Sequence, residues 1–562
     1  MNKKFLLNLL LITFIFSLCS ISAVDDFTHV VSNSEDWKDV YSTIHYANLK
    51  GVGNDFIVST KHGTTLLDEI GKTPKIRVMT SKNTPYVFNY PDTIISKGIA
   101  DADEIVSKNF NIDLIKELPE IKNFIIIDDS YGFNAIAVAP YAKITNSWVF
   151  FANEITIYEI ESILENRNIE NIIIYGHTDK EVKDVLSKYN PEIIDKEDRF
   201  ENNIEIVKKY LEKNPTKQVI LSNGEFIEKE IMSGQEPVLF TGKENVPDKI
   251  RDYIKESDIE IGVLIGNDLV GAATNIRRTA GISVMVKFAR GARGQTGGVA
   301  SIEGLDLFPV PTPSLSLEIH SIKYNKASSQ LEVTYKSDSN LPIYLKGTID
   351  LAVDNEKTKV GDLEAIFMTP GDYKTIIYPL EITVSDYIEA SIYTLFGETT
   401  SSLDRILERT MEVETIDVKD RCKFNEKNIK SVKYSKQKKE FLIKIKNFEA
   451  IDCWADLEIE NIIIDASSET IGSESNTLIP SGKTKTITIK KTLEKQDIEN
   501  NPTIDLISYS GEREFSLVHT YKDNFDLKIQ LLSGLTIAII LLMMITIIGI
   551  TIITKRKFND EL

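Results

Sequence analysis

Residues Ile125 to Leu211 read IIIDDSYGFNAIAVAPYAKITNSWVFFANEITIYEIESILENRNIENIIIYGHTDKEVKDVLSKYNPEIIDKEDRFENNIEIVKKYL and decide the fold of the N-terminal half of the chain. Short apolar runs here, Phe124 to Ile127, Trp148 to Phe151 and Ile172 to Tyr175, alternate with segments of helical period. Such alternation is typical of a parallel sheet with crossover helices. The stretch therefore predicts a Rossmann-like α/β unit.

Short motifs in this stretch carry a family resemblance. Asn134 to Ala142 (NAIAVAPYA) is a helix of small residues, Tyr175-Gly176-His177 follows a strand, and Asp198 to Asn202 (DRFEN) opens the last helix. In this order and spacing the motifs resemble the cell-wall-binding repeat type 2 family, which is known from surface-layer and wall-associated proteins. His177 stands where that family has a second glycine. The resemblance implies that such repeats occur in threes and pack as a pseudo-threefold set.

Two further copies of the unit flank this stretch. In the first copy, at an offset near 95 residues, Tyr46-Ala47 matches Tyr141-Ala142. In the third, at an offset near 90 residues, Val238 to Phe240 matches Trp148 to Phe151. A repeat of this length indicates one domain built of similar units. We therefore expect a three-repeat head over residues 27–295, divided into about 27–118, 122–212 and 216–295.

Both ends of the chain carry membrane signals. Two lysines, an apolar run and small residues up to Ala23 predict a secretory signal peptide over residues 1–23. Residues 531–553 are apolar and uncharged, and their length is sufficient to span a hydrocarbon core of about 30 Å. The basic residues 555–557 predict a cytoplasmic tail, 554–562, and an extracellular bulk. The sequence thus predicts a single-pass, type I protein of the cell membrane.

The C-terminal half follows a different pattern. A Gly- and Pro-rich linker is expected over residues 296–313, and strands of period two come after it. They predict two immunoglobulin-like β-sandwich modules, 314–415 and 420–523. Between them, Ser401 to Glu412 is expected to be a short helix or a loop. The lysines from Lys419 to Lys446 are expected to be solvated strand faces rather than a binding patch.

Cys422 and Cys453 are the cysteines that remain once the signal peptide is removed. The predicted extracellular location is oxidising, which permits a disulfide between them. Two unpaired, buried thiols are the alternative. The sequence therefore makes this pair a candidate disulfide within the second β module.

The residue inventory limits the chemistry expected of the head. The chain contains no G-x-G-x-x-G after its first strand, no G-x-x-x-x-G-K-[ST] and no G-x-S-x-G. Its six histidines are scattered, without metal-ligand spacing. The net charge of −19 argues against a nucleic-acid partner, because phosphate binding requires a basic surface. We therefore expect no enzymatic activity, no cofactor, no metal ion and no nucleic acid.

Polar side chains gather at the predicted strand ends of the second repeat. Asp128, Asp129 and His177 come at or just after strands, and Asn134 opens the helix that follows. Because ligands bind at the carboxyl edge of open α/β sheets, these residues are the candidate ligand site. Polar residues also occur there without function, since strands end at the water surface.

The DRFEN motif has a structural explanation. Asp198 is expected to cap the helix that begins after it, and Glu201 has the spacing to bond back in a capping box. Arg199 is either an ordinary surface arginine or, as the family resemblance implies, a residue of inter-repeat contacts. We include Arg199 among the candidate ligand-binding residues.

We interpret the chain as a cell-surface envelope or adhesion protein whose head binds a surface polymer, a glycan or a neighbouring surface protein. One alternative is a receptor or enzyme with a small-molecule site at the strand ends. Another is a purely structural envelope component. The first requires an exposed groove between repeats, the second a closed polar pocket at the strand ends, and the third would show lateral self-association. Because the chain is acidic, no general attraction to an anionic polymer is indicated.

Overall fold

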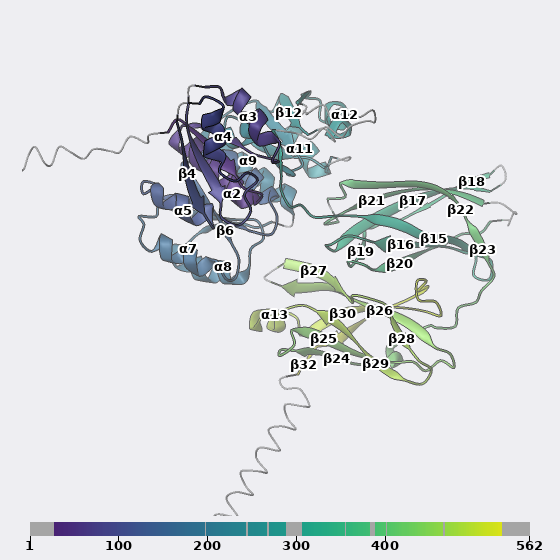
Figure 1. Cartoon of the computed structure of the whole chain (residues 1–562). Coiled ribbons are helices and arrows are strands. Elements are labelled where there is room, and N and C mark those ends of the chain that lie inside the picture. Colours follow the sequence, from purple (N-terminus) through teal and green to yellow (C-terminus); the bar gives the residue numbers. More distant parts are fainter. Residues whose placement is uncertain are drawn as a thin grey trace, which may run out of the picture. The chain divides into compact units, whose positions relative to one another are not determined.

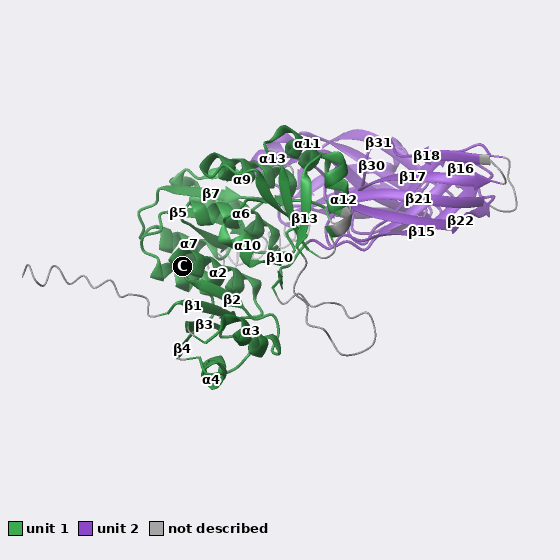
Figure 2. Cartoon of the chain, turned by 90° about the horizontal axis from the view of Figure 1, so that it is seen from above, with its two compact units in different colours: residues 1–312 green, residues 313–562 purple. Residues whose placement is uncertain are grey.

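The computed structural model (Figure 1) describes residues 27–530 except 73, 100, 197, 243–245, 267–268, 288–305, 354–355, 383–387, 401 and 465–466. The chain divides into two compact units, Met1–Thr312 and Pro313–Leu562, which Figure 2 shows in different colours. Unit 1 contains parallel sheets with helices, and unit 2 is rich in β-strands, as the mixed α/β class predicted.

The predicted membrane signals fall outside this range. The signal peptide (1–23), the span (531–553) and the tail (554–562) all lie outside the described residues. In the part of the chain that the structure does describe, no helix combines the length and the apolar character needed to cross a bilayer.

Each repeat of unit 1 alternates strands and helices. The first contains β1 (His29–Asn33), α2 (Trp37–Lys50), β2 (Gly53–Phe56), α3 (His62–Ile70), β3 (Lys75–Ser81), α4 (Tyr90–Ser96), β4 (Asp101–Ser107) and α5 (Phe110–Leu114). The second contains β5 (Asn123–Asp128), α6 (Phe133–Ile144), β6 (Ser147–Ala152), α7 (Ile157–Leu164), β7 (Asn171–Tyr175), α8 (Lys180–Leu186), β8 (Glu192–Ile194) and α9 (Arg199–Lys213). The third contains β9 (Gln218–Ser222), β10 (Phe226–Ile227), α10 (Lys229–Ser233), β11 (Val238–Phe240), α11 (Asp248–Glu256), β12 (Ile261–Ile265), α12 (Val270–Thr279) and β13 (Ser283–Lys287).

The three repeats share one sheet topology. Their strand orders are β2-β1-β3-β4, β6-β5-β7-β8 and β11-β9-β12-β13, and every pairing within them is parallel. In each of these four-stranded sheets the first strand lies between the second and the third strand of that sheet, counted along the chain. The connections from the first strand therefore lead to opposite sides of it, which makes this position the topological switch point of the sheet. An open α/β sheet has a crevice at its switch point.

The first helices of the three repeats, α2, α6 and α10, contact one another in the centre of unit 1. The alanines of α6, which include Ala135 and Ala142, are buried in the same core as Tyr41 of α2 and Ile231 of α10. Small side chains let helices approach closely without a void. The small-residue pattern of α6 is therefore explained by packing between repeats.

A buried asparagine joins each of the first two repeats to the next. Asn111 of α5 donates from Nδ2 to the Val149 carbonyl at 2.8 Å and accepts from the Phe151 N–H at 3.3 Å. Asn203 of α9 makes the same two bonds with the backbone of β11, at 2.9 and 2.7 Å. Because β6 and β11 are edge strands, each amide side chain satisfies backbone groups that the sheet leaves unpaired.

Replacement of Asn203 by Ala is expected to lower the free energy of unfolding of unit 1 by about 2 kcal/mol, because buried backbone groups of β11 lose their partners. Amide hydrogen exchange of the full chain measures this locally, in peptides that cover residues 236–241. Exchange there should be faster in Asn203→Ala than in Glu212→Ala, a control at an exposed position of the same helix. Equal exchange in the two variants would contradict the assigned role.

Residues 306–312, which we call the strap, belong to unit 1. Within the strap, β14 (Phe308–Pro309) pairs antiparallel with β10 of the third repeat. Phe308 is 2% exposed, and its ring lies edge-on to that of Phe56 in the first repeat, with 5.9 Å between centroids. The end of the expected 296–313 linker is therefore not a free spacer, because its apolar side chains pack into the head.

Unit 2 consists of two modules with the same succession of strands. The first contains β15 (Leu317–Asn325), β16 (Gln330–Ser337), β17 (Ile343–Val353), β18 (Glu356–Gly361), β19 (Ile366–Met368), β20 (Tyr373–Pro379), β21 (Ile388–Gly397), β22 (Arg405–Glu412) and β23 (Glu414–Ile416). The second contains β24 (Ile429–Ser435), β25 (Glu440–Lys446), β26 (Cys453–Ile464), β27 (Ser467–Gly472), β28 (Thr477–Ile479), β29 (Thr484–Lys490), α13 (Lys495–Asn500), β30 (Thr503–Gly511), β31 (His519–Asp526) and β32 (Lys528–Gln530).

The two modules are duplicates at the level of topology. Sheets β20-β16-β15-β23 and β18-β17-β21-β22 form the first module, seen as two layers in Figure 1. Sheets β29-β25-β24-β32 and β27-β26-β30-β31 form the second. Their first strands even share a register shift, between Ile319 and Ser321 and between Ile429 and Ser431. The segment 401–412, expected to be a helix or a loop, instead contains the edge strand β22.

A buried ionic cluster lies where the two modules of unit 2 meet. Lys374 of β20 pairs with Glu458 of β26, and the two residues are 5% and 3% exposed. The Lys374 ammonium lies 3.9 Å from the centre of the Tyr509 ring, whose hydroxyl donates to Glu458 at 2.8 Å. Asp372 and Asp456 are buried beside them. One cation therefore faces three carboxyl groups out of contact with water.

Protonation of the aspartates relieves part of this excess of negative charge. Burial raises the pKa of Asp372 to about 6, Lys374 opposes the shift, and Glu458 adds to it. Burial also raises the pKa of Asp456, with the nearby carboxylates adding to the effect. Because the folded protein holds these protons more tightly than the unfolded chain, their contribution to stability is largest at low pH. The contribution of Asp372 falls as pH rises from about 4 to about 6.

The variant Asp372→Asn is expected to stabilise unit 2 by about 1 kcal/mol at pH 7.5, because it removes a buried charge and keeps the oxygen that accepts from the Tyr373 N–H. At pH 4 the aspartate is itself protonated in the folded state, so the variant should have little effect. Calorimetric unfolding of the full chain at both pH values tests this. A destabilised variant at pH 7.5, or the same shift at both pH values, would refute it.

Candidate functional site

The carboxyl edge of the second sheet contains the two adjacent aspartates that the sequence singled out. Asp128 ends β5, and its Oδ1 accepts from the Ser130 N–H at 2.8 Å. Asp129 Oδ2 accepts from Asn153 Nδ2 at 3.1 Å and lies 3.4 Å from the Lys38 ammonium of the first repeat. The two carboxylates thus share one edge but face different partners.

The electrostatics of this edge favour a neutral or cationic group near Asp128. Burial raises the pKa of Asp128, hydrogen bonds from Ser130 oppose the shift, and the negative charges of Asp129 and Asp179 add to it. Asp179 itself accepts from the Glu154 N–H at 2.8 Å. The exposed side chains of Ile155 and Tyr158 follow directly at the start of α7. The edge is therefore acidic, with apolar side chains at its rim.

Asn134 fills the crevice beside β5. It is 5% exposed and lies against Gly176, which follows β7. Gly176 has a φ of +76°, and a Cβ there would come within 2.6 Å of Asn134 Nδ2, so both the backbone angle and the close contact require glycine. The crevice at the topological switch point is therefore occupied by a side chain of the protein.

The strap covers the N-terminal end of α6, two residues before Asn134. The Gly132 N–H, at the N-cap of α6, donates to the Pro311 carbonyl at 2.9 Å. The Val310 N–H donates to the Glu225 carbonyl of the third repeat at 3.0 Å. A Cβ at Gly132 would lie 2.3 Å from the Val310 Cβ, so only glycine allows this contact. The N-terminus of α6, a natural position for an anion, is therefore covered by the chain itself.

His177 and Arg199 lie in surroundings of their own. His177 is exposed, and its Nδ1 is 3.7 Å from Asp195 Oδ2, which also binds the Lys183 ammonium at 2.8 Å. The Arg199 guanidinium lies over the rings of Phe200, at 4.8 Å, and Phe133, at 5.6 Å. The structure thus brings Asp128 and Asp129 to one edge, and it gives His177 and Arg199 other partners than these aspartates.

Arg199 does take part in a contact chain between repeats. Phe133, under its guanidinium, packs closely on Gly224 of the third repeat, where a Cβ would lie 2.9 Å from the Phe133 Cβ. The arginine therefore supports an aromatic side chain at the junction between the second and third repeats.

The Asp198 cap forms, but Glu201 has a different partner from the expected one. Asp198 Oδ1 accepts from the N–H groups of Phe200 and Glu201, at 2.8 and 2.9 Å. The Glu201 carboxylate binds the ammonium of Lys249 at 2.5 Å, and Lys249 also binds Asp198 Oδ2 at 2.6 Å. In a capping box the Glu201 carboxylate would bind the backbone of the N-cap residue. Here it binds the side chain of a lysine from the third repeat.

An open groove lies next to this lysine, between α9 and α11. It has a volume of about 390 Å³ and is lined by Ile204, Lys208, Lys249, Asp252, Tyr253, Glu256 and Ser257. The Lys208 ammonium lies 6.0 Å from the centre of the Tyr253 ring. Burial raises the pKa of Tyr253 to about 12, with the charge of Glu205 adding to the shift, so its hydroxyl remains a neutral donor. The groove offers an aromatic face surrounded by charged donors and acceptors.

The sequence did not single out the groove or the asparagine bridges. The groove is made by helices of two repeats, and its residue types are ordinary for helix surfaces. Asn111 and Asn203 could have been found from their separation of 92 residues, which is close to the repeat offset. The same residue type at matching positions of two repeats, followed by an isoleucine in both, is a signal for a packing role that the repeats share.

Comparison with known proteins finds a limited similarity to solved structures. No protein-family model and no curated protein matches the chain. Among solved structures, Cwp6 from Clostridium difficile has a TM-score of 0.36 and 15% identity, covering 46% of this chain and 44% of its own. Cwp8 from Clostridium difficile has a TM-score of 0.39 and 14% identity, covering 45% of this chain and 47% of its own. The match thus spans under half of those chains, and at this level it carries no inference about what this chain binds.

Within the described parts of the chain, no group of three or more His, Cys, Asp or Glu could hold a metal ion.

Proposed function

We propose that this chain is a membrane-anchored protein of the cell surface whose three-repeat head binds an envelope glycan or polymer through the groove between α9 and α11. The observation that carries the proposal is the contrast between two places in the head. The strand-end crevice of the second repeat is filled by Asn134 and covered by the strap. The groove at the junction of the second and third repeats is open.

The chemistry of the groove suits a carbohydrate. A sugar ring has apolar C–H faces and hydroxyl edges, so it fits a site that combines an aromatic face with hydrogen-bonding groups. Tyr253 supplies the face and a hydroxyl, Lys208 supplies donors, and Asp252 and Glu256 supply acceptors. Because the groove has both signs of charge, it does not depend on a polyanionic ligand, which the acidic chain would repel.

The remaining parts of the chain suit presentation of such a head at a surface. Residues 1–23 have the pattern of a signal peptide, and the apolar residues 531–553 have the length of a membrane span. A disulfide joins Cys422 and Cys453, as is usual in an oxidising compartment. The two modules of unit 2 are bound to each other by the Lys374 cluster and by Arg513, which binds Glu332 at 2.8 Å. Unit 2 therefore serves as a stiff stalk.

Binding of the full chain to isolated envelope fractions, before and after enzymatic removal of their glycans, tests the proposal. Wild-type protein should bind glycan-bearing fractions and lose that binding when glycans are removed. The variant Tyr253→Ala should bind about tenfold more weakly, because the aromatic face is lost. Tyr393→Ala, which removes a partly exposed tyrosine from the stalk, is the matched control and should bind like wild type.

Other results would assign the chain to another class. If Tyr158→Ala, at the rim of the strand-end edge, abolishes binding while Tyr253→Ala does not, the binding site is the strand-end edge. If no variant and no glycan removal alters the behaviour, and the chain instead associates with itself at rising concentration, it is a structural envelope component.

A further inference from the structure

A lysine-rich hairpin lies at the end of the second module from which the chain leaves the described residues. Strand β24 ends at Ser435, and the hairpin Lys436-Gln437-Lys438-Lys439 leads from it into β25. The last described strand, β32, runs parallel to β24, and Gln530 is the register partner of Ser435. The hairpin and the segment 531–553 therefore begin at the same end of the module.

The first module provides a comparison within the same molecule. Its hairpin between β15 and β16 occupies the equivalent place, and Ser329 there has a φ of 52°, as Lys439 has a φ of 54°. Its closing strand β23 runs parallel to β15, with Ile416 as the register partner of Asn325. That hairpin reads Lys-Ala-Ser-Ser over residues 326–329. Lys438 and Lys439 therefore correspond to serines in the first hairpin, and only the module that precedes the apolar segment has lysines at these two positions.

The positive charge of this hairpin is available for a partner. Residues 436–439 are all exposed. Lys438 lies 3.3 Å from Glu440, while within the described residues no carboxylate is within ion-pair distance of Lys436 or Lys439. The end of the module thus carries a local excess of positive charge on a chain whose net charge is −19.

We propose that the hairpin 436–439 contacts anionic lipid headgroups of the membrane in which the chain is anchored. The inference rests on the membrane anchoring proposed above. Lysines close to an anionic bilayer are attracted to it within about one Debye length, roughly 10 Å at 0.1 M salt. An acidic protein tethered to the same bilayer would otherwise be repelled. The hairpin holds the base of the stalk against the surface, which sets the direction in which the stalk leaves the membrane.

The test uses the full chain reconstituted into vesicles, with a spin label attached at Gln437→Cys. The native cysteines of the module do not interfere, because they form a disulfide. Accessibility of the label to a water-soluble nickel relaxant is compared between phosphatidylcholine vesicles and vesicles that also contain phosphatidylglycerol. Ala327→Cys, the equivalent exposed position in the first hairpin, is the matched control label.

Accessibility at 437 should fall about threefold in the anionic vesicles and recover at about 0.5 M salt, where charges are screened within a few ångströms. Accessibility at 327 should be the same in both vesicles. In the variant Lys438→Ser with Lys439→Ser, which gives the second hairpin the residues of the first, the fall at 437 should disappear.

The failures of the two proposals are distinguishable. If the chain floats with the vesicles but the label at 437 is equally accessible in both lipids, the hairpin proposal is wrong and the anchoring stands. If soluble polyphosphate protects the label while anionic lipid does not, the partner is not the membrane. If the chain does not float with vesicles at all, the anchoring is wrong and the hairpin proposal falls with it.

Discussion

The variant Lys374→Met is expected to lower the free energy of unfolding of unit 2 by about 3–5 kcal/mol, the range found when one partner of a buried ion pair is removed. Lys374 and Glu458 are both almost completely buried at the junction of the two modules. Methionine keeps the length of the lysine stem and removes the charge. Glu458 would then have no cation, and Asp372 and Asp456 would be buried beside it.

The protonation state of Lys374 supports this expectation. Burial alone would lower its pKa, but the charges of Glu458 and the nearby acidic groups outweigh that effect and raise the pKa well above the ordinary value. The lysine is therefore charged throughout the neutral range. Since its contribution is fully present below the pKa of an unfolded lysine, about 10.4, and is lost as pH rises from there through the raised pKa, the destabilisation by Lys374→Met should persist throughout the neutral range.

Denaturant-dependent hydrogen exchange of the full chain measures this effect in unit 2 separately from unit 1. Peptides that cover β20 and β26 should show the loss, and peptides from the head should not. The double variant Lys374→Met with Glu458→Gln should regain part of the lost stability, because the charge of Glu458 is removed together with that of its partner, while Asp372 remains beside them. A loss below about 1 kcal/mol in the single variant would show that water reaches the cluster and screens it.

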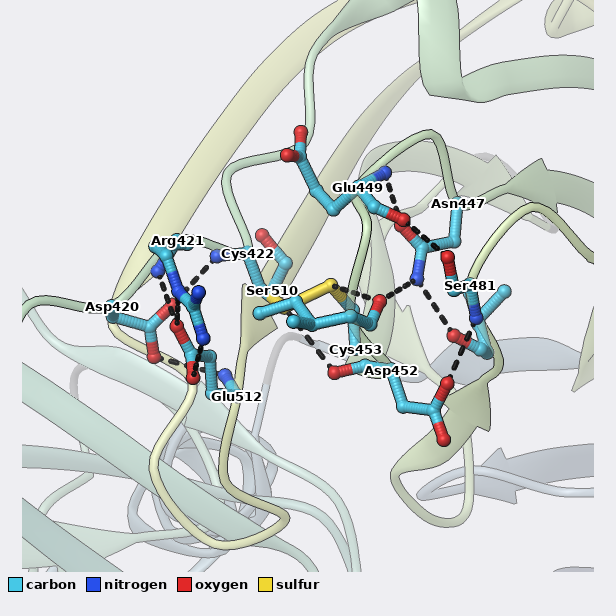
Figure 3. The surroundings of a disulfide bond; sticks show 12 residues. Asp420, Arg421, Cys422, Asn447, Glu449, Asp452, Cys453, Ser481, Ser510 and Glu512 are labelled. Carbon is cyan, nitrogen blue, oxygen red and sulfur yellow. Dashed lines mark hydrogen bonds and ion pairs between the residues drawn. A yellow bond between two sulfur atoms is a disulfide. The ribbon is translucent and has the colours of Figure 1, made fainter.

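Removal of the disulfide is expected to cost about 3–4 kcal/mol, because the crosslink between Cys422 and Cys453 closes a loop of 31 residues in the unfolded chain. The bond ties the segment that enters the second module to the first residue of β26 (Figure 3). Neighbouring bonds hold the same segment: Asp420 accepts from the Cys422 N–H at 2.9 Å, and Arg421 binds Glu512 at 3.0 Å. The module should therefore keep its fold when the bond is absent, at lower stability.

Thermal unfolding of the full chain, with and without a reductant, measures this contribution, and Cys422→Ser with Cys453→Ser serves as the genetic equivalent. Both should lower the transition of the second module and leave that of the head unchanged. A reductant effect that persists in the double serine variant would show that it does not arise from this bond. An unchanged transition would contradict a stabilising crosslink.

Much of the fold could be predicted from local pattern. The apolar runs and the small-residue helix of the 125–211 stretch repeat at about 90 residues, so one α/β unit predicted its two neighbours. Period-two alternation indicated the β modules in the same way. Strand β22 was not predicted, because it is an edge strand with largely exposed side chains and neither of its faces is required to be apolar. The packing of the strap was not predicted, because a Pro-rich composition is found both in spacers and in packed, extended segments.

The candidate site shows where a single sequence stops being informative. The position of Asp128 at a strand end and of Asn134 at the start of the next helix followed from topology, and the structure places them there. Their partners come from distant segments, such as Lys38 beside Asp129 and Val310 over Gly132. No local pattern contains those contacts. The groove likewise depends on how α11 of one repeat packs beside α9 of another.

Hydrogen exchange of the full chain, with and without a purified envelope glycan, tests the central claim most directly. The claim predicts protection in peptides that cover residues 204–211 and 248–257, which line the groove, and none in peptides 128–135 and 153–160 at the strand ends. Protection confined to the strand-end peptides would contradict it and place the ligand at the strand ends.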